Sequence, residues 1–426
     1  MPRFALPLLL TALLLAGGPA RASGMEPDPG LHARHRVAGL EQRVFSAEHW
    51  WALTTPLLGS DRGFAVATIG RSAQGRELRH VRWGNGPVQV LLWSQMHGDE
   101  STATMALADL VAWLGHPEPD SRRDTLGQAL TLHLVPLLNP DGAAAFTRRN
   151  AQGIDINRDA AALASPEAQA LKALRDRIGA DYGFNLHDQR PGYRAGDSDK
   201  GTAIALLAPP ADAQASPTPA RLRAIGVAAR MAEVLDGPLH GHLARWDDTF
   251  NPRAFGDLMQ QWGTSTVLIE AGGIEGDAQK QQLRAHVFSA IVTGLHTIAD
   301  GSWAQADADR YLGLPENGKV WPDLLIRGAT IAQPGIAPVQ ADVLVDFEHA
   351  LSGQDGRIVD IGDLRQVRAR QVIDADGLYL LPLAEAHVGT EQPARFRLAR
   401  DAEGRQAVWQ IDRDLDPAQP LPAAVR

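Results

Sequence analysis

The pattern of apolar positions divides the chain into two regions. Between residues 64 and 300, short continuous apolar runs alternate with stretches in which apolar residues recur every three or four positions. The continuous runs are typical of strands buried on both faces, and the longer period is typical of helices. After residue 317 the runs are short, are separated by Gly, Asp and Pro turns, and lack helical periodicity. The sequence therefore predicts an α/β region followed by a β-rich region.

The first region contains both element types in alternation. Predicted strands cover residues 64–69, 77–83, 88–93, 130–138, 184–186, 203–207 and 264–269, and predicted helices cover 101–114, 221–235 and 279–298. This alternation favours a mixed central sheet flanked by helices. In such sheets functional side chains gather at the carboxyl ends of the strands.

The remaining boundaries follow from composition. Residues 301–317 are polar and rich in Gly, Pro and Asp, which predicts a linker between a catalytic domain at 23–300 and a small all-β, sandwich-like accessory domain at 318–426. Residues 1–22 have a basic start, an apolar run too short to span a bilayer and an Ala-Arg-Ala end, which predicts a signal peptide rather than a buried helix. We therefore expect an exported protein, periplasmic or extracellular, with no membrane span in the mature chain.

Charge and cysteine content narrow the possible chemistry. The formal net charge is -9 and no long basic block occurs, so a nucleic-acid partner is not expected. The chain has no cysteine, which excludes disulfides and thiolate chemistry. Any bound metal ion must then be held by histidines and carboxylates.

Polar residues follow several of the predicted strands. His97 and Glu100 come after the strand at 88–93, and His187 comes after the strand at 184–186. Zn²⁺ binds imidazole nitrogen and carboxylate oxygen, and three protein ligands with one open position are typical of a catalytic zinc site. The alternative for His97 and Glu100 is an ordinary polar turn. The alternative for His187 is a histidine that makes only structural hydrogen bonds at the end of a strand.

A carboxylate for proton transfer also stands at a strand end. Glu270 ends the strand at 264–269 and precedes two glycines, so we expect it to act as a general base on zinc-bound water, or else to be a surface residue of the turn. The Arg- and Asn-rich segment 148–158 suits carboxylate binding, although alone it reads equally as a solvated basic loop.

Five motifs in one order carry a family resemblance. They are H-G-D-E (His97–Glu100), N-P-D-G (Asn139–Gly142), R-x-N-x-x-G-x-D-x-N-R (Arg148–Arg158), L-H (Leu186–His187) and L-I-E-A-G (Leu268–Gly272). Together they resemble the zinc carboxypeptidases of the carboxypeptidase A type, the M14 peptidases, over about residues 45–300. The resemblance implies a bacterial, exported member of this family.

The resemblance implies a role for each matching residue. It gives one zinc ion to His97, Glu100 and His187, and the general base to Glu270. It implies that Arg148 polarises the scissile carbonyl. It implies that Asp155 orients His97, the first zinc histidine. It also implies that Asn157 and Arg158 bind the terminal carboxylate of the substrate.

One family feature is absent from its usual place. The family's substrate-capping tyrosine has no counterpart, because no tyrosine occurs between Tyr193 and Tyr311. Phe250 stands in about that place and is the substrate-contacting residue that the resemblance suggests. A phenyl ring packs on a substrate but donates no hydrogen bond.

The function that follows is a zinc carboxypeptidase acting on peptides with a free C-terminal carboxylate. A zinc amidase of the same fold, acting on peptidoglycan stem peptides or N-acyl amino acids, needs the same residues. A catalytically inactive, carboxylate-binding pseudo-peptidase is the non-enzyme alternative, and it would be expected to lack a ligand or the base.

Overall fold

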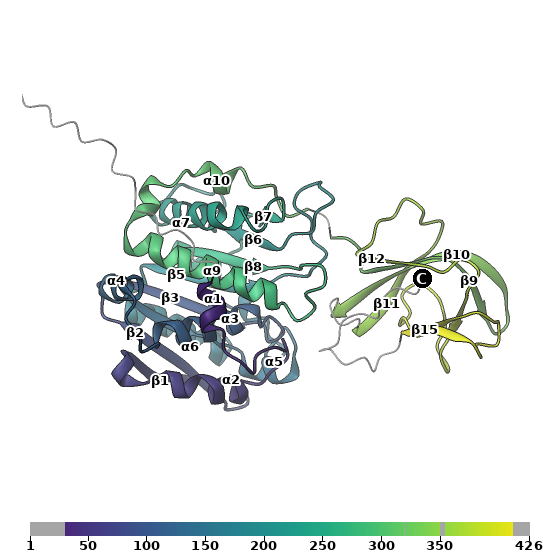
Figure 1. The fold of residues 1–426 in the computed structure, drawn as a ribbon, viewed down its shortest axis with the longest axis horizontal. Helices are drawn as coiled ribbons and strands as arrows, with labels where there is room; N and C mark the ends of the chain where they lie inside the picture. The colour runs from purple at the N-terminus through teal and green to yellow at the C-terminus, as the bar shows by residue number, and fades with distance from the viewer. Residues whose placement is uncertain (1–29, 319, 350–353, 412–426) are drawn as a thin grey trace, which may run out of the picture.

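The chain folds around two separate β-sheets. The computed structural model describes residues 30–318, 320–349 and 354–411. Figure 1 shows the larger sheet with its helices on one side of the molecule and the smaller, all-β part on the other. The predicted signal peptide at residues 1–22 lies outside the described residues.

The larger sheet has eight strands in the order β1-β2-β4-β3-β5-β8-β6-β7. In chain order they are β1 (Phe64–Arg71), β2 (Glu77–Gly84), β3 (Val88–Ser94), β4 (Leu130–Val135), β5 (Tyr182–Asp188), β6 (Ile204–Leu207), β7 (Leu243–Arg245) and β8 (Ser265–Ala271). The four central strands β4, β3, β5 and β8 run parallel to one another. Antiparallel pairs flank them, β2 beside β4 and β6 beside β8. The predicted mixed central sheet is thus confirmed.

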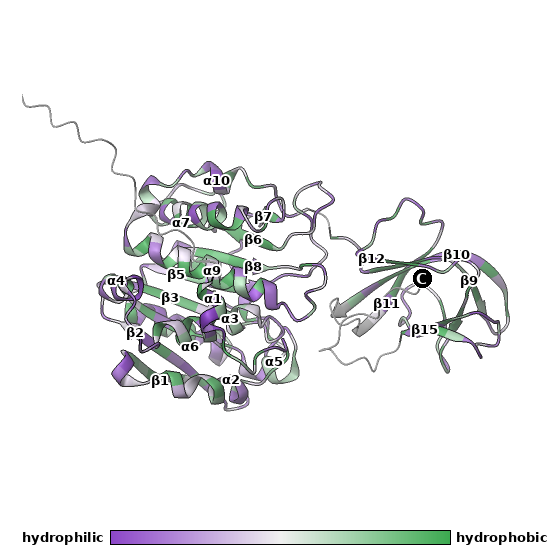
Figure 2. Cartoon of the chain, viewed as in Figure 1, coloured by the Kyte–Doolittle hydropathy of each residue, from purple (hydrophilic) through white to green (hydrophobic). Residues whose placement is uncertain are grey.

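Apolar runs in β4 and β8 explain why these strands lie inside the sheet, and β5 is buried between its neighbours despite its polar residues. Every residue of β4, β5 and β8 is buried, as expected for strands with a packed layer on each face. Figure 2 shows the hydrophobic colouring along β8 and the hydrophilic stretches on outer helices such as α4.

Helices cover both faces of the larger sheet. They are α1 (Leu31–His35), α2 (Ala47–Thr54), α3 (Thr102–Leu114), α4 (Ser121–Ala129), α5 (Pro140–Ala145), α6 (Pro166–Ile178), α7 (Pro219–Asp236), α8 (Phe255–Gln261), α9 (Gln281–Ala299) and α10 (Asp309–Leu312), with short 3₁₀ turns η1 (Thr55–Leu57), η2 (Ser60–Arg62), η3 (Ile156–Arg158) and η4 (Ser302–Gln305). One core cluster joins α3, α7 and α9 to one face of the sheet. A second cluster joins α6 and α8 to the other face.

Part of the stretch predicted as a linker is folded onto the larger sheet's helices. The turn η4 and helix α10 lie within residues 301–317 and pack on α7. Tyr311 in α10 is 2% exposed, and its hydroxyl oxygen accepts a hydrogen bond from the Ala208 backbone at 2.9 Å. The polar composition of residues 301–317 did not indicate this packing, because the buried contact is made by one aromatic residue among polar neighbours. The domain boundaries themselves stay a prediction.

The smaller part is all-β, as predicted. Its strands are β9 (Leu324–Gln333), β10 (Ile336–His349), β11 (Gln354–Gly362), β12 (Gln371–Asp374), β13 (Tyr379–Pro382), β14 (Phe396–Ala399) and β15 (Ala407–Ile411). They form one sheet in the order β11-β10-β9-β13-β14-β15, with β12 beside β9. Backbone hydrogen bonds also join β11 to residues 391–394, the segment that leads into β14. The sheet surrounds a core cluster of its own, separate from those of the larger sheet.

Among the described residues, no helix is both long enough and apolar enough to cross a membrane. Export remains a prediction from the N-terminal sequence.

Candidate active site

Three neighbouring parallel strands deliver the candidate residues to one edge of the larger sheet. The loop 95–100 follows β3, His187 lies near the end of β5, and Glu270 lies near the end of β8. His187 and Glu270 are direct partners in the β5–β8 register, so their side chains share a face. Both strands place their other-face residues, such as Leu186 and Ile269, in the core that α3, α7 and α9 cover. The residues predicted at these strand ends therefore lie together at one edge of the sheet.

The loop 95–100 is held by a contact between two backbones. A Cβ atom placed on Gly98 would lie 1.9 Å from the carbonyl carbon of Gly142, so no side chain fits there. Asn139 ties the two segments together, since its amide nitrogen donates to the Met96 carbonyl at 3.2 Å. Its oxygen accepts from the Gly142 backbone at 2.8 Å and caps α5. The N-P-D-G motif is thus the support of the H-G-D-E loop as well as a turn.

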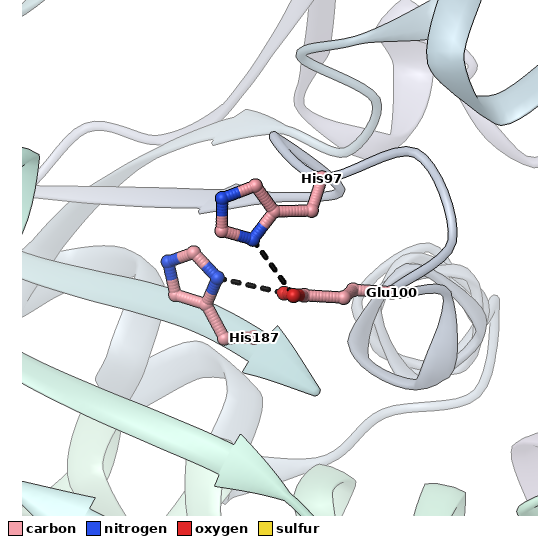
Figure 3. A group of neighbouring side chains, drawn as sticks. All are labelled: His97, Glu100 and His187. Atoms are coloured by element: carbon pink, nitrogen blue, oxygen red, sulfur yellow. Dashed lines mark hydrogen bonds and ion pairs between the residues drawn. The ribbon is translucent and has the colours of Figure 1, made fainter. Parts of the chain in front are cut away.

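The three predicted ligands meet in one buried cluster, as Figure 3 shows. The Nδ1 atoms of His97 and His187 each lie 2.7 Å from a carboxylate oxygen of Glu100. All three ligand atoms lie within 4.8 Å of one another. His97 and His187 are each 2% exposed, and Glu100 is 7% exposed. Within the described residues this is the group of His and carboxylate side chains that could hold a metal ion.

Hydrogen bonds orient both imidazole rings toward the cluster. Asp155 lies 3.0 Å from Nε2 of His97, which leaves Nδ1 facing Glu100. The amide of Asn157 lies 3.4 Å from Nε2 of His187. A carboxylate behind a metal-binding imidazole fixes its tautomer and increases its basicity. Two imidazole nitrogens and one carboxylate with an open side fit a catalytic zinc ion.

The cluster also favours the ionised ligand carboxylate. Burial alone would raise the pKa of Glu100, but the two imidazoles lower it well below its ordinary value. For His97, burial works toward a lower pKa, and the carboxylates of Glu100 and Asp155 more than offset it. Burial lowers the pKa of His187 despite the neighbouring Glu100. An ionised carboxylate beside imidazoles is the state that a metal ion requires.

Glu270 has the environment of a proton acceptor. It is 7% exposed and lines the same cavity as His97 and Glu100. Burial, with the charges of Glu100 and Asp188, raises its pKa well above the ordinary value. Its Oε2 atom has no hydrogen-bond partner among the described residues. Catalytic carboxylates commonly show this combination of a cleft position and a raised pKa.

Arg148 lies beside the ligand cluster. Its Nη1 atom is 3.2 Å from Oε1 of Glu100, and its Nε donates to Asp155 at 3.1 Å. The side chain is 44% exposed, so it can also reach a substrate in the cavity. A cation in this position can stabilise negative charge on a bound ligand.

Asn157 and Arg158 lie in η3 and line the cavity. Asn157 accepts a hydrogen bond from the Phe255 backbone at 2.9 Å, so its amide joins η3, α8 and His187. Arg158 donates to the Asn157 carbonyl at 2.7 Å. No carboxylate of the described residues forms an ion pair with Arg158, which leaves this guanidinium able to bind an anionic ligand.

The structure places Phe250 away from the cavity. Its neighbours Thr249 and Asn251 line the cavity, whereas Phe250 packs against the core cluster of α6 and α8. The aromatic lining residues are Tyr193 and Trp246, whose ring centroids are 5.4 Å apart. Phe250 is partly buried, and its contact with a substrate stays a prediction.

The cavity of about 530 Å³ contains further polar residues that the motifs did not indicate. Asn185 is fully buried, and neither polar atom of its side chain has a partner in the described part of the chain. It stands two residues before His187 and shares its face, so a polar position inside a buried strand was the available signal. Burial raises the pKa of Asp257 to about 6.

Two buried cations lie near the carboxylates of the cavity. Lys280 donates from Nζ to Asp188 and to the Ala271 carbonyl, both at 3.0 Å. Arg43 lines the same cavity and lies over the Phe146 ring at 5.0 Å. No sequence motif marked either residue, because each comes from a segment far from the ligands along the chain.

Comparison with known proteins agrees with this geometry. Residues 62–176 match the family model described as zinc carboxypeptidase, a stretch that includes His97, Glu100 and the segment 148–158 but ends before His187. Within the described residues, the cluster of His97, Glu100 and His187 fits the single zinc ion of that family.

This chain spans 38% or less of the length of the curated relatives that it matches. An uncharacterized protein of Zymomonas mobilis is 28% identical over 147 residues, which cover 34% of this chain and 38% of that protein. Carboxypeptidase SOL1 of Arabidopsis thaliana is 30% identical over 102 residues, covering 22% of this chain and 20% of that protein. A solved metallo-carboxypeptidase from Burkholderia cenocepacia has a TM-score of 0.48 at 20% identity, covering 61% of this chain and 71% of that one.

Proposed function

We propose, on the premise that residues 62–176 of this chain belong to the zinc carboxypeptidase family, that the protein hydrolyses the C-terminal peptide bond of its substrates. The observation that carries the proposal is the shared cavity. It brings the ligand cluster, the unpartnered carboxylate oxygen of Glu270 and the guanidinium of Arg158 together. A metal site, a base and an anion-binding group are the parts that such a reaction requires.

Each side chain has a definite part in the proposed reaction. His97, Glu100 and His187 hold one zinc ion, which when bound lowers the pKa of a water molecule and polarises a carbonyl oxygen. Glu270 takes a proton from the attacking water and returns it to the amine nitrogen as the carbon–nitrogen bond breaks. Arg148 stabilises the negative charge that develops on the carbonyl oxygen.

Substrate orientation falls to the residues of η3. Arg158 binds the terminal carboxylate of the substrate, and Asn157 holds η3 against α8 and beside His187. A guanidinium matches a carboxylate through two parallel hydrogen bonds, which fixes direction as well as position. This arrangement limits cleavage to the last residue of a chain.

A substrate panel tests the proposal. The protein would be loaded with one equivalent of zinc and incubated with free peptides, the same peptides amidated at the C-terminus, N-acyl amino acids and muropeptides. Mass spectrometry should show release of single C-terminal residues from the free peptides and little from the amidated ones. Release from muropeptides or N-acyl amino acids alone would instead identify an amidase. No release from any substrate would favour the non-catalytic alternative.

We also infer export from the N-terminal sequence. The first 22 residues have the basic, apolar and small-residue order of a signal peptide. N-terminal sequencing of the protein from its native host should then begin near Ser23, and an intact start at Met1 would contradict export by this route.

A further inference from the structure

The rim of the cavity is built from a loop that follows β5. We call residues 189–196 the rim loop. Four of its residues, Gln189, Arg190, Pro191 and Tyr193, line the cavity. The Tyr193 ring also packs against the ring of Trp246, another lining residue. The position of this loop therefore sets the shape of the space that a substrate would occupy.

Backbone hydrogen bonds join the rim loop to the segment that leads into the smaller sheet. We call residues 316–323 the junction segment; residue 319 is outside the described residues. The Gly196 nitrogen donates to the Glu316 carbonyl at 2.8 Å, and the Trp321 nitrogen donates to the Gly192 carbonyl at 2.7 Å. The Asn317 amide donates to Gln189 at 2.5 Å.

Close packing accompanies these hydrogen bonds. A Cβ atom on Gly192 would lie 2.7 Å from the Trp321 carbonyl oxygen and equally close to a methyl group of Val320. The rim loop can follow the junction segment this closely only because residue 192 has no side chain.

A buried carboxylate then fixes the rim loop to the smaller sheet itself. Asp323, directly before β9, is fully buried and accepts a hydrogen bond from Nη2 of Arg190 at 2.5 Å. The same Nη2 atom lies 3.2 Å from Asp346 in β10. Arg370 donates to the other oxygen of Asp323 at 2.9 Å. The guanidinium of a cavity-lining residue is thus bound between two carboxylates of the smaller sheet.

From these contacts we propose that the smaller sheet positions the cavity: Asp323 and Asp346 hold Arg190, and through it the rim loop with Tyr193, in the form that accepts substrate. The proposal rests on the peptidase function proposed above. Asp323 is a positioning residue, since it touches Arg190 and has no place in the reaction. Its loss should weaken substrate binding while leaving the metal site and the base intact.

The test compares two ionic contacts that cross the same junction. In the Asp323→Asn variant the Arg190 contact loses its charge. In the Arg368→Gln control, an exposed pair between Arg368 and Asp199 is lost, and neither of those residues lines the cavity. We expect Asp323→Asn to raise KM about three- to tenfold with kcat within twofold and zinc content unchanged. Arg368→Gln should leave KM within twofold.

Two further variants separate positioning from general loss of structure. Gly192→Ala should raise KM in the same direction, because its methyl group displaces the rim loop from the junction segment. In a Tyr193→Ala background, the KM effect of Asp323→Asn should shrink below twofold, since the two changes act through one loop. Equal KM effects of Asp323→Asn and Arg368→Gln, or a loss of kcat and zinc with KM unchanged, would overturn the proposal.

Hydrogen exchange gives a readout that needs no substrate. Asp323→Asn should speed amide exchange in residues 189–196 relative to wild type and to Arg368→Gln. Unchanged exchange in that loop would overturn the positioning role. Absence of hydrolysis in every variant, with faster exchange in Asp323→Asn, would overturn the peptidase function and leave the contact between sheet and loop established.

Discussion

Charge compensation around the cavity depends on individual side chains. Burial raises the pKa of Glu270, and the neighbouring carboxylates of Glu100 and Asp188 raise it further. Arg148 and Lys280 work in the opposite direction and lower the pKa of Glu270. A bound divalent cation would add to their effect. Substitution of any of these four neighbours should therefore change the protonation of Glu270.

Replacing Glu270 tests the proposed base directly. Glu270→Gln keeps the shape of the side chain but cannot accept a proton, so kcat should fall roughly 10²- to 10⁴-fold while zinc stays bound. Turnover and metal content would be measured together on the free peptides. The exposed neighbour Glu275, changed to Gln, is the matched control and should retain wild-type turnover. A Glu270→Gln enzyme with normal kcat would remove Glu270 from the reaction.

Replacing Arg158 tests the carboxylate clamp. Arg158→Ala removes the guanidinium that has no carboxylate partner among the described residues, so kcat/KM for free peptides should fall about 100-fold or more. The amidated peptides, which are already poor substrates, should change little. Arg149→Ala provides the control, because Arg149 is exposed and donates to the Gly153 carbonyl at 3.0 Å. Equal losses for both peptide classes would argue against the clamp.

The proposed ligands and the proposed base could be found from the sequence, and most cavity residues could not. His97 and Glu100 are three residues apart, and His187 and Glu270 each end an apolar run, so local pattern marks all four. Tyr193 reaches the cavity through a loop whose path depends on contacts with residues more than a hundred positions later. Such positions follow from tertiary structure and leave no local signal.

At the scale of elements, strands with continuous apolar runs were the easiest to predict. The run Val88–Trp93 became β3, and the run in 264–269 became β8 with a shift of one or two residues. Helix α6 was not predicted, although Ser165 caps it and Pro166 occupies its first turn. Its mean composition is polar, although Ala168, Leu171 and Leu174 recur at helical spacing and form one buried face, so the signal was present in the sequence. Strands β14 and β15 were missed because both are short and close to turns.

A histidine pair links β2 to β4 and should make stability depend on pH. Nε2 of His80 lies 2.9 Å from Nδ1 of His133. Burial lowers the pKa of His80 to about 4, and burial with the neighbouring His80 lowers that of His133 to about 3. The unfolded histidines titrate near pH 6.5. The unfolded chain then binds more protons from about pH 6.5 down to the folded pKa values, so the free energy of unfolding should fall as pH falls through that window.

Urea unfolding at pH 7 and pH 5 measures this effect. Wild type should lose on the order of 1 kcal/mol per buried histidine over that interval, after allowance for partial exposure. His133→Asn should lose less over the same interval, even if it is less stable at pH 7. The exposed His240, changed to Asn, should reproduce the wild-type dependence. A pH dependence in His133→Asn equal to that of wild type would exclude the pair as its source.

At the scale of the molecule, the two sheets have separate cores and share few segments. The clusters of the larger sheet contain no residue of the smaller sheet, and the reverse also holds among the described residues. The ligand cluster lies wholly in the larger part. Metal binding should therefore stabilise one part of the molecule and leave the other almost unchanged.

Calorimetry with and without zinc tests this division. We expect two unfolding transitions, of which one rises by several degrees with excess zinc, because a ligand at a thousand times its Kd adds about 4 kcal/mol to the folded state. A chelator should reverse the shift. In His187→Ala the zinc effect should disappear from that transition. A single transition that shifts as a unit would show instead that the contacts at Asp323 couple the two parts into one cooperative structure.

The backbone contact between Gly98 and Gly142 has a consequence for how this sequence can vary. The two residues belong to motifs some forty positions apart, yet a Cβ atom on Gly98 would meet the Gly142 backbone, and one on Gly142 would meet the side-chain amide of Asn139, which donates to the Met96 carbonyl. In a saturation library, substitutions at either position should be strongly depleted, because each would displace the loop that carries His97 and Glu100. The position of His97 and Glu100 then depends on the absence of side chains at two glycines that are distant in the sequence. Divergent evolution can change the surface around this pair far more easily than the pair itself.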